Sequence, residues 1–281
     1  MGLLSSRFAA NNLTLVGLWM LLCPQLAAQQ LEIEIGAFFS DTSTDISAYE
    51  NYGNHKFDLN FESELNLPAD KTLPYINLEY HVKPNHLIYS DWRRLHREGL
   101  QQALSRPFSL KIDGQTYQFQ AGARLETRLD VDIIRVGYGY RFYHSSSLDA
   151  YFLSGFHITK LGLGFAGEIG IATSEQPPYA NENVFSAVTA PLPNVGFEVN
   201  HRLSDRLALK SHAHAFYLKV NDITGWMAEL EIGAKYRLVD ELNITGSFSY
   251  YQIGVDYQTE HTELDVIYRF WGPMLKLSYA F

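Results

Sequence analysis

Residues 263–281 read ELDVIYRFWGPMLKLSYAF and end the chain on an aromatic side chain. Counting back from Phe281, strongly apolar residues stand at every second position, at Tyr279, Leu277 and Leu275. Smaller or more polar residues lie between them. Because side chains alternate between the two faces of a strand, this segment is predicted to be a strand with one apolar face and one face of smaller or more polar residues.

This ending resembles the C-terminal signature of Gram-negative outer-membrane β-barrel proteins. In that family the terminal strand closes the barrel and is read by the barrel-assembly machinery. The resemblance implies a barrel signal made by Leu275, Leu277, Tyr279 and Phe281, with the assembly machinery as a partner during biogenesis. An ordinary last strand of a soluble sheet shows the same alternation, so the rest of the chain must decide between the two.

The composition favours a membrane barrel. Aromatic residues make up 14% of the chain and charged residues only 19%, whereas soluble domains typically carry about 25% charged residues. After the first thirty residues no uncharged run reaches the length that a membrane helix needs. A protein that crosses a membrane without helices must do so as a closed barrel, because lipid cannot satisfy an open sheet edge. A net charge of −9 argues against a nucleic-acid partner.

The first segment is predicted to be a secretory signal peptide. The run Leu13–Leu22 is apolar and of the expected length, and Arg7 is the charge that precedes it. Small residues follow, so cleavage is expected near Ala28, giving a signal peptide at 1–28 and an outer-membrane β-barrel domain at 29–281. The neighbours of Cys23 do not fit a lipoprotein signal. Cys23 is the chain's one cysteine, so the mature domain must be held by strand pairing and packing.

Alternating apolar and polar residues predict an all-β fold, a transmembrane antiparallel up-and-down barrel of about ten strands. The predicted strands cover 31–39, 73–82, 87–95, 117–143, 149–172, 194–203, 206–220, 226–239, 242–257 and 263–281. Short turns alternate with long loops at 40–72, 96–114 and 173–193, as a barrel with periplasmic turns and extracellular loops requires. The strand-like piece Phe57–Leu65 leaves eight or twelve strands open.

The segment 117–143 contains a change of phase. Before Ile134 the apolar residues occupy odd positions, and from Ile134 onward they occupy even positions. A change of one residue in a continuous strand is typical of a β-bulge.

The polar face of the strands between 194 and 239 is predicted to fill the lumen of a small barrel, while the apolar face meets lipid. Charges inside must pair, because moving an ion out of water costs several kcal/mol. The predicted lumen charge cluster consists of Glu198, Arg202, Lys210, Glu229, Glu231, Lys235 and Arg237. A plug of paired side chains is favoured over a selective pore, since a barrel of this size is narrow inside.

The sequence offers few candidates for catalytic or binding residues. His212 and His214 share a strand face and are weak candidates for a metal site, although a packed lumen histidine is the more common reading. His144 precedes three serines in a turn, without a visible oxyanion site. The stretch WRRLHREGL (92–100) is basic and could contact lipopolysaccharide phosphates, or be a solvated loop. No catalytic residue, cofactor or metal is assigned.

The whole mature chain resembles small outer-membrane barrels of the OmpA-like and OmpW-like kind. The segment Leu65–Tyr89 resembles a proteobacterial barrel family with a TLP…RHRL stretch, although Asn85 stands where that family has Arg. These resemblances imply fold and location and carry no site residues. They imply a Gram-negative cell outer-membrane location, contact with membrane lipid and lipopolysaccharide, and a monomer.

The expected function is that of a non-enzymatic integral outer-membrane barrel, either structural or a narrow pore, with long extracellular loops. One alternative is an outer-membrane lipid-modifying enzyme, a lipid A deacylase or acyltransferase. The other is a surface binding protein that uses its loops.

Overall fold

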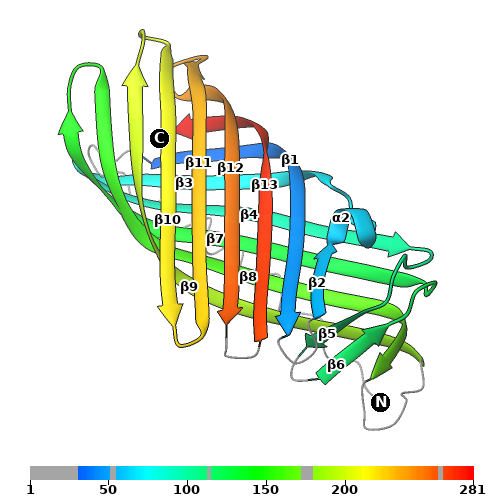
Figure 1. The fold of residues 1–281 in the computed structure, drawn as a ribbon. Helices are drawn as coiled ribbons and strands as arrows, with labels where there is room; N and C mark the ends of the chain where they lie inside the picture. Colours follow the sequence, from blue (N-terminus) through cyan, green and yellow to red (C-terminus); the bar gives the residue numbers. More distant parts are fainter. Residues whose placement is uncertain (1–30, 51–54, 113–114, 172–179, 259–261) are drawn as a thin grey trace, which may run out of the picture.

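The computed structural model describes residues 31–50, 55–112, 115–171, 180–258 and 262–281. Ten antiparallel strands close into a barrel (Figure 1). Around the barrel they follow the order β1, β3, β4, β7, β8, β9, β10, β11, β12, β13 and back to β1. Their bounds are β1 Leu31–Glu50, β3 Asp70–Lys83, β4 His86–Gln101, β7 Leu125–His144, β8 Leu148–Ile171, β9 Ala180–Arg202, β10 Leu207–Val220, β11 Ile223–Arg237, β12 Leu242–Gln258 and β13 Thr262–Ala280.

The predicted closed barrel of about ten strands is confirmed. The C-terminal segment forms β13, which pairs with β1 and places Leu277 opposite Ile35. The Phe281 amide donates to the Leu31 carbonyl at 2.9 Å. The last strand therefore closes the barrel, as its alternation predicts.

Every connection at one end of the barrel is a short turn, whereas the other end carries the long β1–β3, β4–β7 and β8–β9 connections beside the short β10–β11 and β12–β13 connections. The short turns are residues 84–85, 145–147, 203–206 and 238–241. In outer-membrane barrels the short turns face the periplasm, so the opposite end is the extracellular one. Within the described ranges, no helix has the length and apolar character needed to cross a bilayer.

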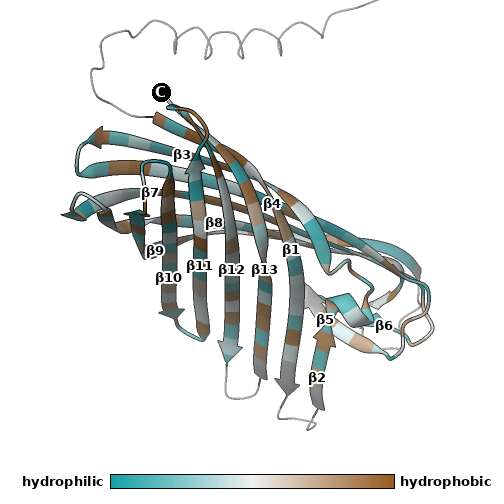
Figure 2. Cartoon of the chain, turned by 90° about the horizontal axis from the view of Figure 1, so that it is seen from above, coloured by the Kyte–Doolittle hydropathy of each residue, from teal (hydrophilic) through white to brown (hydrophobic). Residues whose placement is uncertain are grey.

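The apolar face of the barrel wall changes side partway along the strands. Near the periplasmic end of β7, Val136 and Tyr138 point outward and are exposed. Further along the same strand, Leu129 and Val131 point inward and are buried. Figure 2 shows the alternating hydropathy of the neighbouring strands. Lipid solvates apolar side chains and water does not, so the change marks the outer edge of the hydrocarbon zone, above which the strands surround an ordinary apolar core.

The β-bulge predicted at Ile134 is wrong. Ile133 and Ile134 pair in unbroken register with Thr159 and Ile158 of β8. The register shift of β7 lies instead between Arg141 and Tyr143, beside the periplasmic turn. The apolar positions change from odd to even because the surroundings change along one regular strand. The apolar residues of the periplasmic half face lipid, and those of the extracellular half face the core inside the barrel.

Three segments predicted as loops are partly strand. The 40–72 segment holds the end of β1, the 96–114 segment holds the end of β4 and β5 (Phe108–Ile112), and the 173–193 segment holds the start of β9. Outside the lipid these strands show polar residues to water, so their composition is that of a loop although they continue to pair.

The connection between β1 and β3 folds into the extracellular end of the barrel. β2 (His55–Asn60) pairs with β1 and leads into the short helix α2 (Phe61–Glu64). β5 and β6 (Gln115–Phe119) form a hairpin beside β8. The segment Phe57–Leu65 therefore lies off the barrel path and leaves the strand count unchanged.

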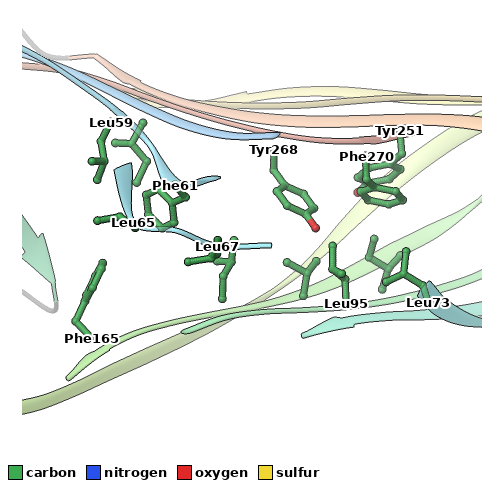
Figure 3. Packing of buried hydrophobic residues seen from close by; sticks show 14 of the residues in the cluster. Leu59, Phe61, Leu65, Leu67, Leu73, Leu95, Phe165, Tyr251, Tyr268 and Phe270 are labelled. Atoms are coloured by element: carbon green, nitrogen blue, oxygen red, sulfur yellow. The ribbon is translucent and has the colours of Figure 1, made fainter. Parts of the chain in front are cut away.

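The residues after β2 supply part of the extracellular core. Figure 3 shows Phe61, Leu65 and Leu67 in one apolar cluster with Leu95 and Phe165. The rings of Phe61 and Phe165 lie 6.5 Å apart between centroids. This connection thus acts as an apolar plug, defined here as residues 57–67, at the β1–β4 side of the mouth.

Candidate functional site

The densest buried charge lies in the lumen at the level of the lipid, where Arg93 and Arg135 meet Asp91 and Glu229. Arg135 donates from Nε to Asp91 Oδ2 at 2.6 Å and from Nη1 to Glu229 Oε2 at 2.7 Å. Arg93 donates from Nη2 to Glu229, and its Nε lies 3.8 Å from Asp91 Oδ1. These side chains are at most 3% exposed. Since β11 lies opposite β4 and β7 in the strand order, Glu229 joins opposite walls of the barrel.

Lysine–glutamate pairs continue this network. Lys276 Nζ lies 2.5 Å from Glu231 Oε1 and 3.2 Å from Glu34 Oε1. Lys210 Nζ lies 2.5 Å from Glu79 Oε1, and Lys210 also lies 3.7 Å from Glu198. Such pairs hold only when each charge keeps its partner, because a single ion left in a buried site is strongly destabilising.

The structure brings together most of the predicted lumen cluster. Glu198, Lys210, Glu229 and Glu231 belong to the network, and Lys235 donates to Glu32. Arg202 and Arg237 are exposed instead, because they lie at the periplasmic ends of their strands. Arg202 donates to the Ser145 carbonyl at 3.3 Å in a neighbouring turn.

Sequence reasoning missed Arg93, one of the two arginines at the centre of the network. It placed Arg93 with Arg94 in one basic patch, which is wrong, because strand alternation turns Arg93 inward and Arg94 outward. The signal was present in the sequence of β4, where Asp91 and Arg93 fall on the face opposite to that of Ile88 and Trp92. Lys276 was missed for a similar reason, since it is the polar residue between two lipid-facing leucines of β13.

His212 and His214 both point into the lumen. His212 Nε2 lies 3.5 Å from Glu229 and 3.9 Å from Glu231. His214 Nδ1 lies 3.2 Å from the Asn194 side-chain nitrogen. Across the ranges that the structure describes, no three His, Cys, Asp or Glu residues are grouped so as to hold a metal ion. His212 therefore contacts the ionic network, and the His214 ring lies 5.4 Å from the His212 ring between centroids.

Little space is left among these side chains. The cavity between Glu34, Tyr89, Lys210 and His214 has a volume of about 20 Å³, which is room for about one water molecule. Above this level the lumen is filled by apolar side chains such as Tyr251 and Phe270, whose rings stack 4.4 Å apart.

Two arginines fasten the apolar plug. Arg97 is 1% exposed and donates to Glu62 Oε1 and Thr44 Oγ1, each at 2.6 Å. Arg106 donates from Nε to Glu64 Oε2 at 2.6 Å and from Nη2 to Glu64 Oε1 at 2.8 Å. These bonds hold α2 against β1 and β4.

Acid is expected to loosen the Glu64 end of the plug. The hydrogen bonds from Arg106 lower the pKa of Glu64 below its ordinary value of 4.5. A carboxyl whose pKa is depressed in the folded state stabilises that state above the ordinary value, and the stabilisation disappears as pH falls through the folded pKa. Because Arg106 is 44% exposed, the effect should stay below about 1 kcal/mol. Hydrogen-exchange protection of residues 61–67 should fall in acid, and E64Q should remove this dependence; an unchanged dependence in E64Q would contradict the assignment.

The outer face above the lipid carries a groove of about 510 Å³. Residues of β4, β7, β8 and β9 line it, among them Glu98, Glu126, Arg128, Gly164, Asn183 and Phe185. A Cβ at Gly164 would come within 3.0 Å of the Phe185 ring, so the glycine lets this ring lie against the sheet. The Arg128 guanidinium lies 5.8 Å from the same ring.

His96 lies on the outer face next to this groove. Its Nδ1 is 3.3 Å from Asp130 Oδ1 and its Nε2 is 3.2 Å from Asp132 Oδ2. Both ring nitrogens are thus engaged, and the arrangement does not leave an imidazole ready to act as a catalytic base.

The His–Ser stretch at 144–147 forms the periplasmic turn between β7 and β8. His144 Nδ1 lies 2.5 Å from Asp149 Oδ1, and Ser145 Oγ donates to the Leu148 carbonyl at 3.3 Å. The serine hydroxyl therefore stabilises the turn instead of pairing with the imidazole.

Comparison with known proteins supports the fold. No family model and no curated protein matches the sequence. The outer membrane protease OmpT from Escherichia coli superposes with a TM-score of 0.57 at 10% identity, over 90% of this chain and 97% of that chain. The transport unit of the autotransporter AIDA-I from Escherichia coli gives 0.41 at 10% identity over 96% of both chains, and a Pseudomonas aeruginosa FadL homologue gives 0.38 at 10% identity over 90% of both.

The closed antiparallel wall, its outward apolar band and the ionic lumen define the class of structure. The chain has the β-barrel fold of Gram-negative outer-membrane proteins, which indicates a bacterial outer-membrane location. The predicted signal peptide at 1–28 lies outside the described residues.

Proposed function

We propose that the protein is a non-conducting, non-enzymatic outer-membrane barrel that presents a rigid extracellular half as a binding surface. The observation that carries this proposal is the filled lumen, in which Arg93, Arg135 and Glu229 connect opposite walls at the depth of the lipid. The apolar core above them closes the lumen at a second level. A wide channel would need neither layer.

The extracellular half supplies the surface. Its strands continue beyond the lipid, and the ion pairs of Arg97 and Arg106 fasten the plug inside them. Arg94 and Lys160 point outward just above the apolar band, at the height where lipopolysaccharide carries its phosphates. Charge-assisted hydrogen bonds from such side chains suit phosphate. Lipopolysaccharide is therefore the proposed partner, with the protein acting as a monomer.

Planar-bilayer recording tests the closed lumen. Purified wild-type protein, confirmed as folded by its heat-modifiable gel mobility, should give no discrete conductance steps. A general porin inserted under the same conditions serves as the positive control. Reproducible steps from the folded wild-type protein would show an open path and refute the non-conducting assignment.

A further inference from the structure

The barrel wall is interrupted between β9 and β10. The two strands pair from Ala208–Arg202 to Ala215–Val195, where their described pairing ends. β9 nevertheless continues its pairing with β8 for many residues, as far as Ile169–Ala180. β10 continues its pairing with β11 to the Val220–Ile223 end. In Figure 1, β9 and β10 lie side by side toward the top of the picture and diverge toward the bottom.

Prolines mark the interruption on β9. Continuing this register by two residues would put Pro193 opposite Tyr217, and by four residues Pro191 opposite Lys219. Proline has no N–H to donate, so it prevents a regular ladder and is tolerated mainly where a strand forms an edge. Both prolines are exposed. This seam, defined here as the unpaired junction above Val195 and Ala215, is thus encoded in the sequence.

The seam opens at the depth of the hydrocarbon. Pro193 pairs with Phe156 and Pro191 with Ile158 on β8. Phe156 belongs to the outward apolar band and is 58% exposed. The apolar, lipid-facing surface of the barrel therefore continues up to the edges of the seam.

The inner wall beside the seam is apolar and open. On β10, Phe216 is buried, whereas Leu218 and Val220 on the same face are 40% and 55% exposed. On β9, Leu192 packs partly against the extracellular core. The opposite side of the mouth is filled by the plug, so the uncovered apolar wall lies on the seam side.

We propose that the seam is a lateral portal that admits an acyl chain of an outer-leaflet lipid onto this inner wall. Continuity with the lipid-facing band identifies the membrane as the source of the chain. The aliphatic and aromatic side chains at the seam, Leu192, Phe216 and Leu218, match a hydrocarbon chain and offer no charge to a polar ligand. The portal goes beyond the proposed binding surface and does not require a conducting lumen.

Quenching by brominated lipid tests the portal. Leu218→Cys, labelled with an environment-sensitive fluorophore, is reconstituted into phosphatidylcholine vesicles with or without dibrominated acyl chains. We expect at least a twofold loss of fluorescence in the brominated vesicles. Leu209→Cys on the lipid-facing side of β10 is the positive control, and Val266→Cys on the inner wall of β13 is the matched inward control. Quenching at Leu209 together with none at Leu218 would overturn the portal.

Replacing the prolines tests the route. Pro191→Thr/Pro193→Thr restores two N–H groups and should extend the β9–β10 ladder, lowering the quenching of the Leu218 label toward that of the Val266 label. Pro273→Thr in β13, where Pro273 pairs with Phe248 of β12, is the control and should leave the quenching unchanged. Undiminished quenching after both replacements would show entry by another route and refute the portal.

Discussion

Replacing Arg93 with methionine is expected to lower the free energy of unfolding by about 3–5 kcal/mol, because it leaves Glu229 and Asp91 with one buried cation instead of two. Arg93 is 3% exposed and also lies 5.3 Å over the Tyr75 ring, so the loss includes its packing. Urea titration of the protein in detergent micelles, followed by the heat-modifiable gel band, measures the change.

The neighbouring arginine provides the control. Arg94 has a side chain that is 52% exposed and pairs with Asp132 at 3.5 Å on the outer face, so Arg94→Met should cost less than about 1 kcal/mol. Adding Glu229→Gln to Arg93→Met should recover part of the loss, because the orphaned carboxylate is then neutral. Equal losses for Arg93→Met and Arg94→Met would contradict an inward-facing Arg93.

Replacing Ile232 with arginine is expected to cost about 2–4 kcal/mol, the range for a cation on the lipid face near the bilayer midplane. Ile232 is 57% exposed on the outer face of β11 and lies between Trp226 and Tyr236, which suit the two aromatic girdles of a barrel. Folding from urea into lipid vesicles measures the cost.

A second site on the same strand controls for this substitution. Thr224 lies on the same face beyond Trp226, toward the extracellular end, where an arginine should cost only about 0–1 kcal/mol. A cost that is equal at both depths would mean that Ile232 does not face hydrocarbon.

Strand number and closure could be predicted from the sequence because the lipid-spanning halves alternate strongly. The residues Leu207, Leu209 and Ala213 of β10, for example, all lie on one face, and β13 shows the same pattern to its last residue. The extracellular extensions could not be predicted, because there the same strands turn polar side chains to water and read as loops.

The buried ionic network was predicted only in part. Arg93 and Glu229 are 136 positions apart, and their contact depends on how the strands are staggered around the barrel. Alternation says which side chains face inward, but it does not say which of them meet across the lumen. The sequence predicts a loop at Pro191 and Pro193 for the same reason, since only the pairing of β9 with β8 shows that these residues lie in a strand.

Nitroxide labels at two positions of β7 test most directly that the barrel wall meets lipid in its lower half and water in its upper half. Val136→Cys and Arg128→Cys both place a label on the outer face, eight residues apart along one regular strand. Oxygen dissolved in lipid is expected to relax the Val136 label, while a water-soluble nickel reagent is expected to relax the Arg128 label. A Val136 label that is open to the nickel reagent in the folded, reconstituted protein would contradict the outward apolar band.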